Sequence, residues 1–142
     1  MVAQDCARVY RTNSVMTASP GQLVLMLYDG ALKAMALARN ALARPSNDQG
    51  RLQEYDTHVL KAQRIFFELL ATLNQNAGDG QFAREMDRLY RYYISRLADA
   101  NIKKEEGPII EVEQLFGQVR DAWAEMLRRQ DPACTKNSRS AA

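Results

Sequence analysis

Apolar residues recur at intervals of three and four through four long stretches of the chain, and polar residues occupy the positions between them. The first stretch follows Ser19, whose side chain can cap a helix, and Gln22 stands where it completes a capping box. Its two apolar stripes consist of Leu23, Met26, Leu27, Gly30, Ala31 and Ala34, and of Val24, Tyr28, Ala31, Met35, Ala38 and Leu42. The pattern predicts a helix that ends near Pro45, because the residue before a proline avoids helical angles.

Three further helices are predicted by apolar stripes within residues 52–73, 82–100 and 108–126. The second fades before Gly78, which suits a left-handed stop, and Pro108 suits the first turn of the fourth. No stretch alternates with a period of two, so no strand is predicted. Because short loops join the helices, we expect an all-α fold, an antiparallel up-down-up-down four-helix bundle over residues 19–127.

The two ends of the chain differ in composition. Residues 1–18 are too short to fold alone, yet they contain Val9, Tyr10, Val15 and Met16. We expect this segment to lie on the bundle as an N-terminal capping segment, or lid. Residues 128–142 have almost no large apolar side chain and carry a surplus of basic ones, so a disordered basic tail is expected.

The first predicted helix has more apolar surface than one bundle core needs. One stripe can fill the core and leave Val24, Tyr28 and Met35, or their counterparts, exposed. Large exposed apolar patches mark partner sites, and the six methionines suit a surface that repacks against a partner. The pattern therefore predicts helix-in-groove binding of another protein's amphipathic segment. The alternative is that both stripes are core because this helix is the inner one.

Catalytic and metal-binding patterns are not found in the sequence. His58 is its single histidine, and Glu54 precedes it by four positions, whereas a di-metal bundle needs Glu-x-x-His pairs. Cys6 and Cys134 stand near opposite ends without a CxxC pair and are expected to be reduced thiols. We therefore expect no catalytic residues, no cofactor, no metal and no enzymatic activity.

The net charge and the hydropathy exclude further classes of partner. The net charge is +2, with the positive surplus near the ends, so the body is weakly acidic and unsuited to a polyanion. Arg84, Arg88 and Arg91 form a basic stripe beside Tyr92 that could contact phosphates, but a solvated helix face is the simpler interpretation. Without a secretory signal or an apolar run of about twenty residues, we expect a cytoplasmic protein without membrane insertion or nucleic-acid binding.

The stretch from Tyr10 to Ala31, YRTNSVMTASPGQLVLMLYDGA, closely resembles the opening signature of the flagellar secretion chaperones of the FliS family. The resemblance covers about residues 8–127. It continues through Leu70–Asn74, Leu89–Tyr92, Leu97–Asn101 and Ala122–Trp123, although these later pieces are weak alone. The sequence departs from the family pattern in the connector Lys103–Glu106 and in the basic tail.

The resemblance implies a cytosolic export chaperone that binds the disordered C-terminal region of flagellin. Binding would prevent premature polymerisation and aid delivery to the flagellar export apparatus. It also implies that the segment around Tyr10 caps the groove until the client displaces it, although Tyr10 could instead be a core anchor. The residues expected to bind the partner or to form the lid are Tyr10, Asn13, Val15, Thr17, Leu23, Met26, Leu27 and Tyr28.

Several alternatives stay open at this point. A helical adaptor could bind other folded proteins through the same apolar surface. The free protein could form a homodimer through it, and the pattern does not determine which helix faces form the groove.

Overall fold

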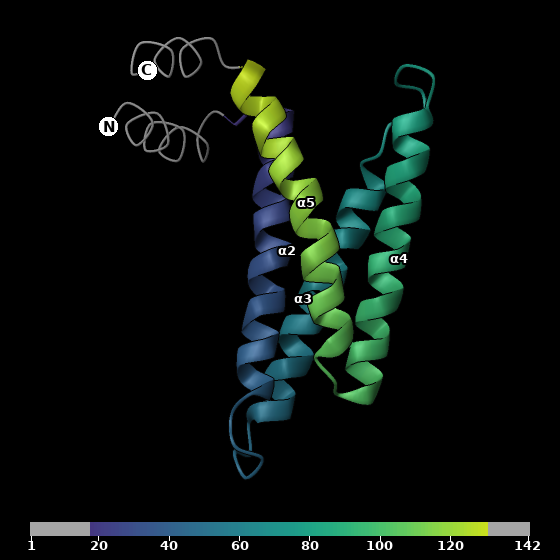
Figure 1. Cartoon of the computed structure of the whole chain (residues 1–142). Helices are drawn as coiled ribbons and strands as arrows, with labels where there is room; N and C mark the ends of the chain where they lie inside the picture. Colours follow the sequence, from purple (N-terminus) through teal and green to yellow (C-terminus); the bar gives the residue numbers. More distant parts are fainter. Residues whose placement is uncertain (1–17, 131–142) are drawn as a thin grey trace, which may run out of the picture. The chain divides into compact units, whose positions relative to one another are not determined.

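The computed structural model describes residues 18–130, and all regular secondary structure in that range is helical. The helices are α2 (Pro20–Leu42), α3 (Arg51–Ala71), α4 (Gln81–Lys103) and α5 (Gly107–Gln130). These residues form two compact units, one of residues 27–117 and one that joins 18–26 to 118–130. The first unit contains parts of all four helices, and successive helices in it run in opposite directions (Figure 1). The predicted all-α four-helix bundle is confirmed.

The capping box at the start of α2 is present as predicted. The Ser19 backbone N–H donates to Gln22 Oε1 at 2.8 Å, and the Gln22 N–H donates to Ser19 Oγ at 3.2 Å. These bonds satisfy backbone donors that have no partner within the helix. The helix begins at Pro20, so the local sequence is sufficient to set this boundary.

Three helix ends differ from the prediction. Helix α3 ends at Ala71, so Gly78 has the expected left-handed φ of 55° but lies within the following loop. Helix α4 continues to Lys103, and Lys104 adopts φ 55° at its C-cap. Helix α5 continues past Leu127 to Gln130, where Arg128 and Arg129 both pair with Glu125. Pro108 lies in the first turn of α5, as predicted.

The core of the 27–117 unit is built around four aromatic rings, one from each helix. Phe116 packs edge-on against Tyr28 and against Phe66, with ring centroids 4.9 Å apart in both pairs, and lies 5.5 Å from Tyr93. All four side chains are almost completely removed from solvent. Such edge-to-face contacts stabilise a core beyond the area that they bury.

Of the two predicted apolar stripes of α2, the one with Tyr28 and Met35 is buried, and Val24 is half-buried. The small side chains Ala31, Ala34 and Ala38 are buried with them. The exposed residues are counterparts from the other stripe, Leu23 and Met26, so the alternative that both stripes are wholly core is wrong.

The unit of residues 18–26 and 118–130 is held together at the first turn of α2. Trp123 Nε1 donates to the Gly21 carbonyl at 2.9 Å. A Cβ on Gly21 would lie 2.8 Å from Cδ2 of Leu127, so glycine allows this side chain to approach the backbone. None of the helices within residues 18–130 is long and apolar enough to span a membrane.

Candidate partner-binding surfaces

Helix α2 carries two exposed apolar side chains within the unit that contains residues 18–26, and we call this pair, Leu23 and Met26, the α2 line. Their exposed fractions are 50% and 43%. The spacing of three residues places them on one side of the helix. Leu37 lies in the 27–117 unit and is 37% exposed. In that unit a Cβ on Gly30 would be 3.4 Å from Cδ1 of Ile65 on α3.

The predicted partner-binding residues fall into three groups. Tyr10, Asn13, Val15 and Thr17 lie outside the described residues. Leu23 and Met26 are exposed and available to a partner, whereas Leu27 is half-buried and Tyr28 is only 1% exposed. The structure thus brings Leu23 and Met26 together on the surface and places Tyr28 in the core.

Tyr28 is fixed in the core by a hydroxyl pair. Its Oη lies 2.7 Å from Tyr90 Oη of α4. Burial is the main cause that raises the pKa of both phenols, so both stay protonated at neutral pH. A buried hydroxyl costs free energy unless it is hydrogen-bonded, and the pair provides that partner between α2 and α4. The hydroxyl pair therefore joins α2 to α4 within the 27–117 unit.

Sequence analysis missed a second line of exposed apolar side chains, which lies on α3. Leu52, Leu60 and Phe67 are 44%, 48% and 56% exposed. Leu60 and Phe67 lie off the core stripe of α3, which holds Val59 and Phe66 instead. The signal in the sequence was that Leu60 and Phe67 are apolar although they lie outside this core stripe. The prediction concentrated on the first helix, where the apolar surplus is larger.

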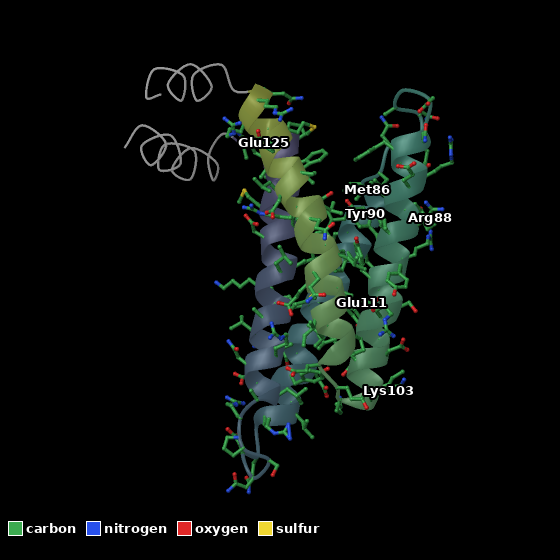
Figure 2. All side chains as sticks on the ribbon, viewed as in Figure 1. Met86, Arg88, Tyr90, Lys103, Glu111 and Glu125 are labelled. Atoms are coloured by element: carbon green, nitrogen blue, oxygen red, sulfur yellow. The ribbon has the colours of Figure 1, made fainter. Side chains whose placement is uncertain are left out.

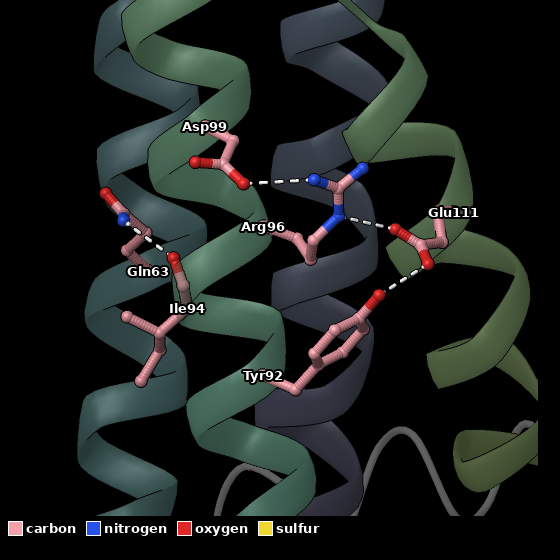
Figure 3. A network of polar contacts seen from close by, with 6 residues as sticks. All are labelled: Gln63, Tyr92, Ile94, Arg96, Asp99 and Glu111. Carbon is pink, nitrogen blue, oxygen red and sulfur yellow. Dashed lines mark hydrogen bonds and ion pairs between the residues drawn. The ribbon is translucent and has the colours of Figure 1, made fainter.

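Polar contacts join α4 to α5 on the surface of the 27–117 unit. Glu111 accepts hydrogen bonds from Tyr92 Oη and from Arg96 Nε, both at 2.6 Å, and Arg96 Nη1 also binds Asp99 at 3.0 Å (Figure 3). The hydrogen bond from Tyr92, followed by that from Arg96, lowers the pKa of the Glu111 carboxyl. The Tyr92 hydroxyl is therefore engaged in this network.

Within residues 18–130, no group of three or more His, Cys, Asp and Glu side chains is arranged to hold a metal ion.

Comparison with known proteins gives the family. The model of the family described as "Flagellar protein FliS" matches residues 2–130. The chain belongs to the FliS family. A flagellar secretion chaperone FliS of Bacillus subtilis is 39% identical over 128 residues, which cover 90% of each chain.

Two further FliS relatives show a similar extent of likeness. The flagellar secretion chaperone FliS of Salmonella typhimurium is 37% identical over 121 residues, covering 84% of this chain and 85% of the relative. The flagellar secretion chaperone FliS of Escherichia coli is 33% identical over 125 residues, covering 87% of this chain and 88% of the relative. The residues of both exposed lines lie within the range that the family model matches.

Proposed function

We propose that this chain is a non-enzymatic export chaperone that binds the C-terminal region of flagellin in the cytoplasm. Binding keeps that region from polymerising early and helps to deliver it to the flagellar export apparatus. Membership of the FliS family supports this proposal, as does the description of its relatives as flagellar secretion chaperones. A chaperone of flagellar secretion has to hold a substrate of the flagellar export machinery.

The exposed α2 line carries the proposal within the structure. Leu23 and Met26 present apolar surface about one helical turn apart, as an amphipathic helix of a client requires. Burying apolar surface contributes roughly 25 cal/mol per Å². Ordering a disordered client costs several kcal/mol of binding free energy, so the complex can be specific and still release its cargo.

The N-terminal segment is proposed as a lid over the same line. Residues 1–18 contain Tyr10 and Val15, apolar side chains that need a surface, and the segment leads directly into α2. In the free protein these side chains would shield Leu23 and Met26 from water. The client would displace them, and that displacement would lower its net affinity.

A matched pair of leucine variants tests the client site. Leu23 and Leu60 are 50% and 48% exposed, on different helices. We expect Leu23→Ser to weaken binding of a flagellin C-terminal peptide at least ten-fold in isothermal titration calorimetry, and Leu60→Ser to leave it within two-fold. Both variants should remain folded by circular dichroism, since surface substitutions change stability by about 0.5 kcal/mol or less.

Two results would contradict the proposal. If the wild-type chain binds no flagellin peptide, or if Leu23→Ser and Met26→Ser both bind it as tightly as wild type, the α2 line is not the client site. A helical adaptor for folded proteins is the alternative function. It predicts binding to an intact folded partner with no affinity for the isolated flagellin peptide.

A further inference from the structure

A second surface lies along the outer side of the α3–α4 hairpin, within the 27–117 unit. Gln63 Nε2 of α3 donates to the Ile94 carbonyl of α4 at 3.2 Å (Figure 3). Near the other end, Lys104 Nζ contacts both Asp56 and Asn101. These contacts fix the register of the two helices. Because the helices are antiparallel, each residue further along α3 lies opposite a residue earlier in α4.

The register brings exposed apolar residues of α3 next to a basic row on α4. Phe67 stands one turn beyond Gln63, so it lies opposite the turn that precedes Ile94, which contains Arg91. Leu60, almost one turn on the other side of Gln63, lies opposite the turn that follows Ile94, which contains Ala98. Phe67 and Leu60 are 56% and 48% exposed, and Ile94 and Ala98 of α4 are half-buried. An apolar strip therefore lies beside the arginines.

The basic row consists of Arg84, Arg88 and Arg91, all exposed. Their spacing of four and three residues places them along one side of α4, over roughly 10 Å at 1.5 Å per residue. Figure 2 shows Arg88 on the outer side of the helix, away from the buried Met86 and Tyr90. A shallow hollow of about 340 Å³ is lined by Gln81, Arg84, Glu85 and Arg88.

Two of these positive charges are not neutralised within the described range. Arg84 donates to the Asp79 backbone carbonyl at 3.3 Å, which leaves its charge uncompensated. Arg88 has no hydrogen-bond or ion-pair partner among residues 18–130. Arg91 pairs with Asp87 at 2.7 Å, but its side chain is 66% exposed and this pair is a weak surface one.

We propose that this α3–α4 face, defined by Leu60, Phe67, Arg84, Arg88 and Arg91, binds an acidic amphipathic helix of a second protein. The apolar side of that helix covers Leu60 and Phe67. Carboxylates three and four residues apart along it pair with the arginine row, as flanking charges do beside a coiled-coil seam. The site goes beyond the flagellin proposal, because it uses other helices and a partner of different chemistry.

The observations favour a protein helix over a nucleic acid or an anionic membrane. Glu85 and Asp87 lie on the same helix as the arginines, and Glu68 is exposed on α3. These acids repel an extended polyanion, whereas a helix can place its few carboxylates opposite the arginines alone. The adjoining apolar strip also matches a side chain of a protein and not a phosphate backbone.

The test uses two designed helical peptides of about three heptads with the same leucine face. One carries Glu at the flanking positions, and its twin carries Lys at each of them. We expect the full chain to bind the Glu peptide at least ten-fold more tightly than the Lys peptide, by fluorescence anisotropy. The variant with Arg84→Glu, Arg88→Glu and Arg91→Glu should reverse that preference. Replacing the three arginines with Gln should abolish it without adding repulsion, should the Glu variant fold poorly.

Apolar variants separate this site from the client site. Phe67→Ser and Leu60→Ser should each weaken binding of the Glu peptide at least five-fold, and Leu23→Ser should leave that affinity within two-fold of wild type.

The proposal is overturned if the Gln variant binds the Glu peptide like wild type, or if Phe67→Ser has no effect on that affinity. It is also overturned if duplex DNA or phosphatidylglycerol vesicles compete as well as the Glu peptide, because the row would then be a general polyanion surface. The flagellin titration with Leu23→Ser can fail or succeed independently of all these outcomes.

Discussion

At the scale of single residues, the Tyr28–Tyr90 pair shows how a polar group can specify a core. An apolar side chain in place of either tyrosine would satisfy the hydrophobic pattern equally well. The hydroxyls, 2.7 Å apart and buried, require α2 and α4 to meet at these two positions. A register that separated them would leave buried hydroxyls with fewer partners, which costs about 1–3 kcal/mol per group.

The phenylalanine variants of this pair give the first prediction. Tyr28→Phe and Tyr90→Phe should each lower the free energy of unfolding by about 1 kcal/mol, because each takes a hydrogen-bond partner from the other hydroxyl. The double variant should lose less than the sum of the two single losses. Urea unfolding followed by circular dichroism measures all three.

Tyr92→Phe is the matched control, since its hydroxyl bonds to Glu111 at the exposed surface. We expect it to change stability by no more than about 0.5 kcal/mol. Additive losses in the double variant would mean that the two buried hydroxyls are not coupled.

At the scale of elements, glycine positions separate helix interiors from helix boundaries. Gly117 lies inside α5, and a Cβ there would meet no atom within 4 Å. Gly80 precedes α4 with φ 77°, and a Cβ there would lie 2.9 Å from the Gln75 carbonyl oxygen. Neither the backbone angle nor the packing requires a glycine at Gly117, whereas both require one at Gly80.

Alanine substitutions at these two glycines should therefore have opposite signs. Gly117→Ala should raise the free energy of unfolding by about 0.5–1 kcal/mol, through helix propensity and the lower entropy of the unfolded chain. Gly80→Ala should lower it by about 1 kcal/mol or more, because an L side chain is disfavoured at positive φ and its Cβ contacts backbone. Thermal unfolding of the two variants side by side checks both, and a destabilised Gly117→Ala would contradict the open space around that residue.

At the scale of the whole molecule, buried phenols make stability depend on alkaline pH. Burial is the largest cause that raises the pKa of Tyr55 and of Tyr93 to about 12. Tyr55 Oη donates to the carbonyls of Ala100 and Glu105, so its proton is part of the turn between α4 and α5. An unfolded tyrosine loses its proton near pH 10.

The sign of the pH dependence follows from this difference. Below pH 10 the tyrosines are protonated in both states, and their contribution to stability is fully present. Between pH 10 and about 12, the unfolded chain binds fewer protons than the folded one, so the free energy of unfolding falls as pH rises. Urea midpoints measured on both sides of pH 10 should show this decline, and the tyrosinate absorbance of the buried tyrosines should appear with unfolding and not before it. Full ionisation of all tyrosines near pH 10 in a folded chain would contradict the prediction.

Deletion of residues 1–18 tests the lid at the same scale. The shortened chain begins at Ser19 and keeps the capping box, so the fold should remain intact by circular dichroism. Removal of a competing segment should tighten or accelerate binding of the flagellin peptide, because the client no longer displaces a lid. If the deletion unfolds the domain, then Tyr10 and its neighbours are ordinary core residues.

Local sequence was sufficient wherever a short-range rule decides the structure. Ser19 and Gln22 set the start of α2, Pro108 lies in the first turn of α5, and apolar periodicity gave four helices and no strand within residues 18–130. The stretch from Tyr10 to Ala31 also carried the family, because its residue pattern is specific. All of these features are independent of how the helices pack.

The tertiary structure alone decided which of several similar apolar faces is covered. Tyr28 and Met35 are indistinguishable in pattern from Leu23 and Met26, yet the first two are buried and the last two exposed. Leu60 and Phe67 likewise differ from Val59 and Phe66 only in the direction that each side chain takes from α3. A side chain's burial depends on the neighbours that other helices bring to it, and periodicity along one helix does not contain that information.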